Sequence, residues 1–157
     1  MRMRRYQVSD RIEIRAPVER VYGVAADPEA VPAYAPEVKR IECVRRISDG
    51  VDLVRSHVRV SVLTLAYLYR YSYRPPTHYS GVQEGGWLLR GYFSLSFRAH
   101  GDCTLVSHSE GILSSVPGLA RALGFLYFRV LARGGLREEL EGLKRLVEGS
   151  ADVDKKG

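Results

Sequence analysis

The spacing of apolar residues changes once along the chain, and this change constrains the fold more than any other feature. Between residues 38 and 113, apolar and polar residues mostly alternate, which is typical of strands with one buried face. From Pro117 onward, apolar residues recur three to five positions apart, as they do on one face of an amphipathic helix. The sequence therefore predicts a sheet followed by a long helix over about 117–147.

The segment before the sheet adds one strand and two short helices. Residues 6–15 alternate and predict a strand, in which Asp10 falls on the apolar face, either at a local irregularity or as a buried polar group. Pro17 suits the first position of a helix, and Asp27-Pro28 ends that helix. A second short helix is expected over about 28–34.

Short turns join the remaining strands. The expected strands cover residues 38–47, 51–62, 64–74, 77–83, 87–98 and 103–113. Short connections between consecutive strands favour an antiparallel meander, and the helix must bury its apolar stripe. The predicted fold class is α+β: a curved antiparallel sheet of six to seven strands wrapped around a long C-terminal helix, with two short helices after strand 1.

Length and charge narrow the class of protein. A chain of 157 residues suits one domain, predicted over 6–149, with a basic tail at 1–5 and a flexible tail at 150–157. Half of the net charge of +6 lies in the three N-terminal arginines, which leaves about +3 on the body and argues against nucleic acid as a partner. Because there is neither a secretory signal nor an apolar run of about 20 residues, we expect a cytoplasmic protein without an integral membrane segment.

The sequence contains no motif that demands a metal or a cofactor. Cys43 and Cys103 form no CxxC pair and no zinc pattern, so we expect two independent, buried thiols. HExxH, GxSxG, P-loop and GxGxxG motifs are all missing from the sequence. The expectation is therefore no metal site and no cofactor.

Three stretches resemble a known superfamily. They are IRAPVERVYGVAADPEAVPAYAPEVKRIE at 14–42, GDCTLVSHSEGIL at 101–113 and GLREELEGLKRLVEG at 135–149. Together they resemble the opening, the final strand and the end of the long helix in the START-like, helix-grip (SRPBCC) superfamily. That superfamily includes the birch-pollen-allergen, polyketide cyclase/dehydrase and coenzyme-Q-binding types, and the carbon monoxide dehydrogenase accessory proteins resemble it as well. The resemblance covers about residues 6–149 and implies a cavity between the sheet and the C-terminal helix.

The stretch TLAYLYRYSYRP at 64–75 has a tyrosine at every second position. If the tyrosines faced outward, they would form a cross-strand ladder, and Arg70 and Arg74 would be forced inward without an evident partner. If they face inward, each ring offers the cavity an apolar body and a hydroxyl group. We predict the inward orientation, with ligand contacts from the following residues of the sheet and helix: Tyr67, Tyr69, Tyr71, Trp87, Leu89, Phe93, Phe97, Leu123, Tyr127 and Val130.

His108 and Glu110 are the only candidates for acid–base chemistry. They lie two positions apart, so they share one face of a strand. A histidine beside a carboxylate can transfer protons, but the same pair is also common on the outer face of a sheet, and the sequence favours the outer face.

Three functions remain open from the sequence. The resemblance implies binding or carrying of a hydrophobic or aromatic small molecule, such as a lipid, a quinone or a polyketide-like compound. The alternatives are an enzyme of the polyketide cyclase, aromatase or dehydratase type, and an accessory module that binds a protein partner. Only the enzyme requires an inward-facing acid–base pair.

Overall fold

The computed structural model describes the chain except for residues 1–3, 87, 117, 128–132 and 155–157. Its elements are β1 (Arg4–Ile14), α1 (Val18–Ala25), α2 (Val31–Tyr34), β2 (Val38–Ser48), β3 (Val51–Val60), β4 (Leu63–Arg74), β5 (His78–Gln83), β6 (Leu89–His100), β7 (Cys103–Ser114), α3 (Leu119–Tyr127) and α4 (Arg133–Asp154).

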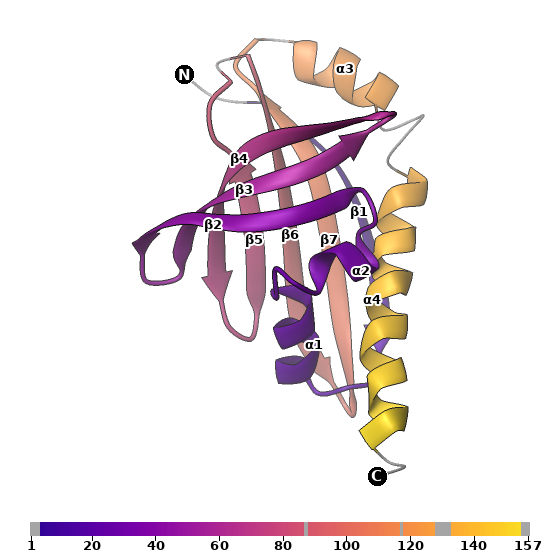
Figure 1. Cartoon of the computed structure of the whole chain (residues 1–157). Helices are drawn as coiled ribbons and strands as arrows, with labels where there is room; N and C mark the ends of the chain where they lie inside the picture. The colour runs from indigo at the N-terminus through magenta and orange to yellow at the C-terminus, as the bar shows by residue number, and fades with distance from the viewer. Residues whose placement is uncertain (1–3, 87, 117, 128–132, 155–157) are drawn as a thin grey trace.

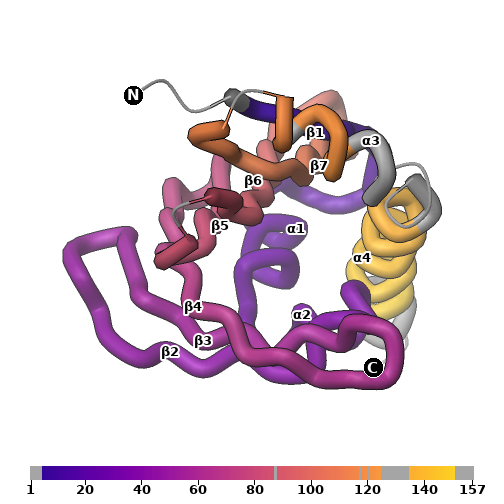
Figure 2. Tube along the Cα trace, turned by 90° about the horizontal axis from the view of Figure 1, so that it is seen from above, coloured from indigo at the N-terminus to yellow at the C-terminus, as the bar shows by residue number. Residues whose placement is uncertain are grey.

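The seven strands form one antiparallel sheet, as the sequence predicts. Their order is β1-β7-β6-β5-β4-β3-β2, so every strand after β1 pairs with the next along the chain, and β1 pairs with β7. The sheet curves around α1 and α2, and α4 runs along its open side (Figures 1 and 2). This arrangement is the helix-grip fold.

Alternation decides which face of each strand is buried. On β1, Ile12 and Ile14 face the core, and Val106 of β7 lies opposite Ile12. α1 begins after Pro17 and buries Val21, Tyr22 and Ala25. The Tyr34 hydroxyl donates a 2.6 Å hydrogen bond to the Ala25 carbonyl, which joins α2 to the end of α1. This bond fixes the two short helices relative to each other, and both lie inside the curve of the sheet (Figure 2).

The predicted single helix over 117–147 is described as two helices instead. α3 contacts β1 and β7, whereas α4 contacts β1, α2 and α1 and buries Leu136, Leu140, Leu143 and Val147. Gly134 and Gly135 fall in the first turn of α4. α3 and α4 run in different directions (Figure 1), so the helix expected over 117–147 is not one straight element, although its C-terminal part is placed as predicted. Residues 128–132, which join the two helices, lie outside the described part of the chain.

Two further expectations differ from the structure. β1 begins at Arg4 and α4 ends at Asp154, so parts of both predicted tails belong to regular elements. Both cysteines are free, but Cys43 is exposed and Cys103 is half-buried, because Cys43 lies on the edge strand β2 and Cys103 begins β7 next to a turn. Among the described residues, no helix combines the length and apolar character needed to span a membrane.

Candidate functional site

A cavity of about 400 Å³ lies on the concave face of the sheet. Its described lining comes from the start of β2 and from the strands that follow it: Glu37, Val38, Ser56, Val58, Val60, Tyr67, Tyr69, Tyr71, Gln83, Leu89, Gly91, Tyr92, Phe93, Glu110, Gly111 and Ile112. Most of this surface is aromatic or aliphatic, with a few polar side chains. Such a lining is typical of small-molecule sites.

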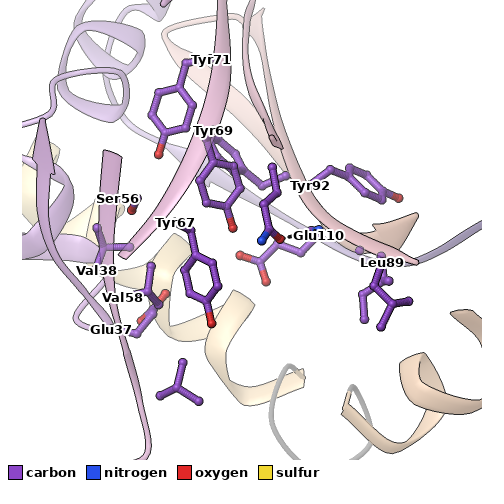
Figure 3. Close-up of a pocket in the computed structure, with 16 residues that line it drawn as sticks. Glu37, Val38, Ser56, Val58, Tyr67, Tyr69, Tyr71, Leu89, Tyr92 and Glu110 are labelled. Atoms are coloured by element: carbon purple, nitrogen blue, oxygen red, sulfur yellow. Dashed lines mark hydrogen bonds between the residues drawn. The ribbon is translucent and has the colours of Figure 1, made fainter. Parts of the chain in front are cut away.

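Tyr67, Tyr69 and Tyr71 of β4 line this cavity, which is the orientation that the alternation predicts. Tyr67 lies opposite Ser56 and Tyr69 opposite Val54 on β3, so the pleat directs all four side chains to the concave face. Figure 3 shows the rings of Tyr67 and Tyr69 pointing into the cavity. Arg70 points to the other face, where it forms a 2.6 Å ion pair with Glu84. The alternation in the sequence thus identified the correct face.

Tyr71 belongs to a buried aromatic cluster at one end of the cavity. Its ring centroid lies 5.3 Å from that of Phe93 and 5.4 Å from that of Tyr79, and both pairs meet edge to face. Tyr73 stacks on Tyr79 with centroids 5.4 Å apart. Burial raises the pKa of the Tyr71 phenol to about 12 and also raises the pKa values of Tyr73 and Tyr79. This end of the cavity is therefore closely packed and holds phenols that are neutral near pH 7.

The other predicted contact residues fall into four groups. Leu89 and Phe93 line the cavity, whereas Phe97 is buried in the core, with its ring 5.3 Å from that of Tyr22. Leu123 is 38% exposed and does not appear in the lining, so its predicted place in the cavity wall was wrong. Trp87, Val130 and the side chain of Tyr127 lie outside the described residues.

His108 is buried, contrary to the outer-face interpretation. Only 3% of the residue is exposed, because β7 directs its even-numbered side chains to the concave face, between α4 and the sheet. The Nε2 atom lies 3.6 Å from Oε1 of Glu110, and the Nδ1 atom lies 3.5 Å from Oε2 of Glu139. Burial lowers the pKa of His108 to about 4, so its imidazole is neutral near pH 7.

Three carboxyl groups, those of Glu37, Glu110 and Glu139, lie near this histidine or in the adjacent cavity wall. Glu110 points into the cavity (Figure 3), and burial, followed by the charge of Glu37, raises its pKa to about 7. Glu139 of α4 is buried, and the side chain of Glu37 lies beside it. Burial is the largest cause that raises the pKa of Glu139 well above its ordinary value, and its interaction with the Glu37 side chain is the next.

The sequence did not reveal this grouping, because only the fold brings its members together. One donor atom from each of His108, Glu110 and Glu139 lies within 4.8 Å of the other two. In the sequence Glu139 lies among other charged residues, Glu138 and Glu141, so the pattern alone places it on the outer surface of the helix. Its apolar neighbour Leu140 marks the buried side of α4, and only the packing of that helix on the sheet shows that Glu139 lies there too.

The fold has many relatives among solved structures. A protein from Thermus thermophilus is 22% identical, with a TM-score of 0.73 over 92% of this chain and 99% of the other. A START superfamily protein from Mycobacterium smegmatis is 21% identical, with a TM-score of 0.71 over 91% and 97% of the two chains. The aromatase/cyclase Zhui from a Streptomyces species is 15% identical, with a TM-score of 0.70 over 92% and 94%. Identities this low establish the fold alone.

Sequence comparison identifies the family. No curated protein matches the chain. Residues 5–148, however, match the family described as polyketide cyclase / dehydrase and lipid transport, and this range includes both the cavity lining and the cluster around His108. The chain belongs to the polyketide cyclase/dehydrase and lipid transport family.

Proposed function

We propose that this protein binds a hydrophobic or aromatic small molecule in the cavity on the concave face of its sheet. The observation that carries the proposal is the lining, in which the rings of Tyr67 and Tyr69 and several aliphatic side chains surround about 400 Å³. A volume of this size falls within the range of about 300–1,000 Å³ that is usual for small-molecule pockets. The family description, which includes lipid transport, supports the same class of ligand.

The polar groups of the lining favour an amphipathic ligand over a pure hydrocarbon. The carboxyl of Glu110 and the amide of Gln83 lie in a wall that is otherwise mainly apolar and aromatic. A buried polar group without a partner costs free energy, so a ligand with hydroxyl, carbonyl or amine groups gains more from this wall than an alkane does. Lipids, quinones and polyketide-like compounds all have such groups. The two free thiols support a cytoplasmic location as part of the proposal.

Binding can be tested with two probes and one pair of matched variants. The probes are menadione, a naphthoquinone, and oleic acid, each titrated against the protein by isothermal calorimetry. Val58→Trp places a large ring in the cavity wall, whereas Val82→Trp adds the same ring at an exposed position of β5. We expect at least one probe to bind the wild type and the Val82 variant equally, and the Val58 variant at least about tenfold more weakly, a loss of about 1.4 kcal/mol. Equal binding by both variants would contradict the proposal.

A second candidate function is catalysis of the cyclase, aromatase or dehydratase type. It is favoured by one observation: Glu110 lines the cavity and also lies 3.6 Å from the buried His108, which supplies an inward-facing acid–base pair. Three of the structurally similar proteins are described as aromatase/cyclases. Incubation with a linear poly-β-ketone thioester should then give a cyclised aromatic product by absorbance, and Glu110→Gln should abolish it. Product formation at the same rate with the variant would exclude this role for Glu110.

A further inference from the structure

The cluster of His108, Glu110 and Glu139 joins two elements that lie far apart in the sequence. His108 and Glu110 come from β7, whereas Glu139 comes from the second turn of α4. A donor atom of each residue lies within 4.8 Å of the other two. One imidazole and two carboxylates form a donor set that suits divalent first-row metal ions.

The spacing within the cluster is too wide for hydrogen bonds. The Nε2 atom lies 3.6 Å from Glu110 and the Nδ1 atom 3.5 Å from Glu139, whereas hydrogen bonds to carboxylates are usually about 2.7–2.9 Å long. Two ligands on one tetrahedral zinc ion, each bound at about 2.0–2.1 Å, lie about 3.4 Å apart. The Nδ1–Glu139 distance therefore matches two donors that share one ion better than two groups that bond to one another. Glu110 lies against the other ring nitrogen, so its carboxylate would reach the same ion from within the 4.8 Å that encloses one donor atom of each residue.

The burial of His108 is the second, independent observation. Its Nδ1 atom is buried and makes no hydrogen bond among the described residues, although it faces the Glu139 carboxylate. Buried polar groups are nearly always satisfied, and an exception commonly marks a missing ion or water. His108 is also the only described residue that approaches Glu110 or Glu139 within ion-pair distance, so no arginine or lysine in that part of the chain neutralises the two carboxylates.

We propose that His108, Glu110 and Glu139 bind one divalent metal ion of the zinc type. Three protein ligands leave a fourth position of a tetrahedral ion open. Because Glu110 also lines the cavity, that position would face the bound small molecule. Glu37, whose side chain interacts with that of Glu139, would orient this ligand as the outer carboxylates of zinc sites do. The site goes beyond the proposed binding function and does not depend on it.

The test uses the full chain, stripped with a chelator and dialysed, with no hydrophobic ligand present. Zn²⁺ is titrated by calorimetry, and Co²⁺ is added separately to record its visible absorption. We expect one ion per chain and intense cobalt bands of a four-coordinate site. His108→Ala and the nearly isosteric Glu139→Gln should each weaken Zn²⁺ binding by at least about 100-fold, since loss of an outer-sphere group alone costs about 10–100-fold.

His57→Ala is the matched control. His57 also has a glutamate partner, with Nε2 3.2 Å from Oε2 of Glu42, but this pair is partly exposed and lacks a second carboxylate in the described structure. The His57 variant should bind Zn²⁺ like the wild type. Val58→Trp should also keep Zn²⁺ binding, even where it loses menadione, which separates failure of this inference from failure of the proposed function.

Several results would overturn the inference. The wild type could show no stoichiometric Zn²⁺ binding and no four-coordinate cobalt bands, or folded Glu139→Gln could bind as tightly as the wild type. Loss of binding in His57→Ala instead of His108→Ala would place the ion on the outer face. Circular dichroism establishes that each variant is folded, and if His108→Ala is not, Glu139→Gln and the wild-type cobalt spectrum decide.

Discussion

Tyr71 on β4 lies directly opposite Gly81 on β5, and the missing side chain of Gly81 makes room for the Tyr71 ring. A Cβ atom at Gly81 would lie 2.8 Å from Cδ1 of Tyr71 and 2.4 Å from Cε1 of Phe93. The aromatic cluster at the end of the cavity thus depends on a glycine on the neighbouring strand. Both rings would have to shift to admit even a methyl group.

Gly81→Ala should therefore destabilise the protein by about 1–3 kcal/mol, the usual cost of overpacking a core. Gly23→Ala is the control, because nothing lies within 4 Å of a Cβ at this position in α1, and alanine there should stabilise the helix by about 0.5–1 kcal/mol. Urea unfolding of both variants measures the two changes. A stable Gly81 variant with unchanged near-ultraviolet circular dichroism would show that the cluster is looser than the structure implies.

The buried phenol of Tyr71 should make stability fall at alkaline pH. Its pKa is about 12 in the folded protein and 10.0 ordinarily, so the unfolded chain releases this proton first as the pH rises. The stabilisation is complete below about pH 10 and is lost between about pH 10 and pH 12. In that window the free energy of unfolding should fall more steeply for the wild type than for Tyr71→Phe, by up to about 1.4 kcal/mol per pH unit. Equal slopes in urea titrations would argue against deep burial of this phenol.

Tyr69→Phe tests whether a tyrosine hydroxyl contributes to ligand binding. The variant keeps the ring and should keep the fold, but affinity for a probe that accepts a hydrogen bond, such as menadione, should fall by about 0.5–1.5 kcal/mol. Arg70→Gln is the neighbouring control, since Arg70 points away from the cavity and pairs with Glu84. A larger loss with the Arg70 variant would mean that the ligand binds on the outer face of the sheet.

Phe93 and Phe97 lie on the same strand, but we expect one to contribute to ligand binding and the other only to stability. Phe97 is buried against Tyr22, whereas Phe93, four positions earlier, lines the cavity. Phe97→Leu should lower stability by on the order of 1 kcal/mol with unchanged affinity for menadione. Phe93→Leu should lower the affinity as well. Thermal unfolding and calorimetry of the two variants distinguish these roles, and an affinity loss restricted to Phe97→Leu would reverse the assignment.

Local alternation made most of the sheet predictable from the sequence. The tyrosine stripe has a period of two and is flanked by arginines, so its buried face follows from the cost of burying an unpaired charge. The same reasoning cannot predict which residues of a buried face line the cavity and which pack in the core. Phe93 and Phe97 share one face and one residue type, yet the position of α1 relative to the sheet decides which of them meets the cavity.

The cluster around His108 could not be predicted, because it depends on long-range packing. Glu139 and Glu138 are adjacent and chemically identical, and only the rotation of α4 against β1 and α2 buries Glu139 and leaves Glu138 exposed. The different directions of α3 and α4 were equally hard to predict. Glycine weakens a helix, but the direction in which each helical segment runs depends on what that segment packs against.

Native mass spectrometry of the purified protein tests the central claim most directly, because it detects a bound small molecule without assuming its identity. The account predicts that wild-type protein, as purified or after incubation with menadione or oleic acid, carries one small molecule that denaturation releases. Val58→Trp should carry none, and Val82→Trp should match the wild type. A wild-type chain that appears only at its bare mass under all three conditions, while folded, would contradict the claim that this cavity is a ligand-binding site.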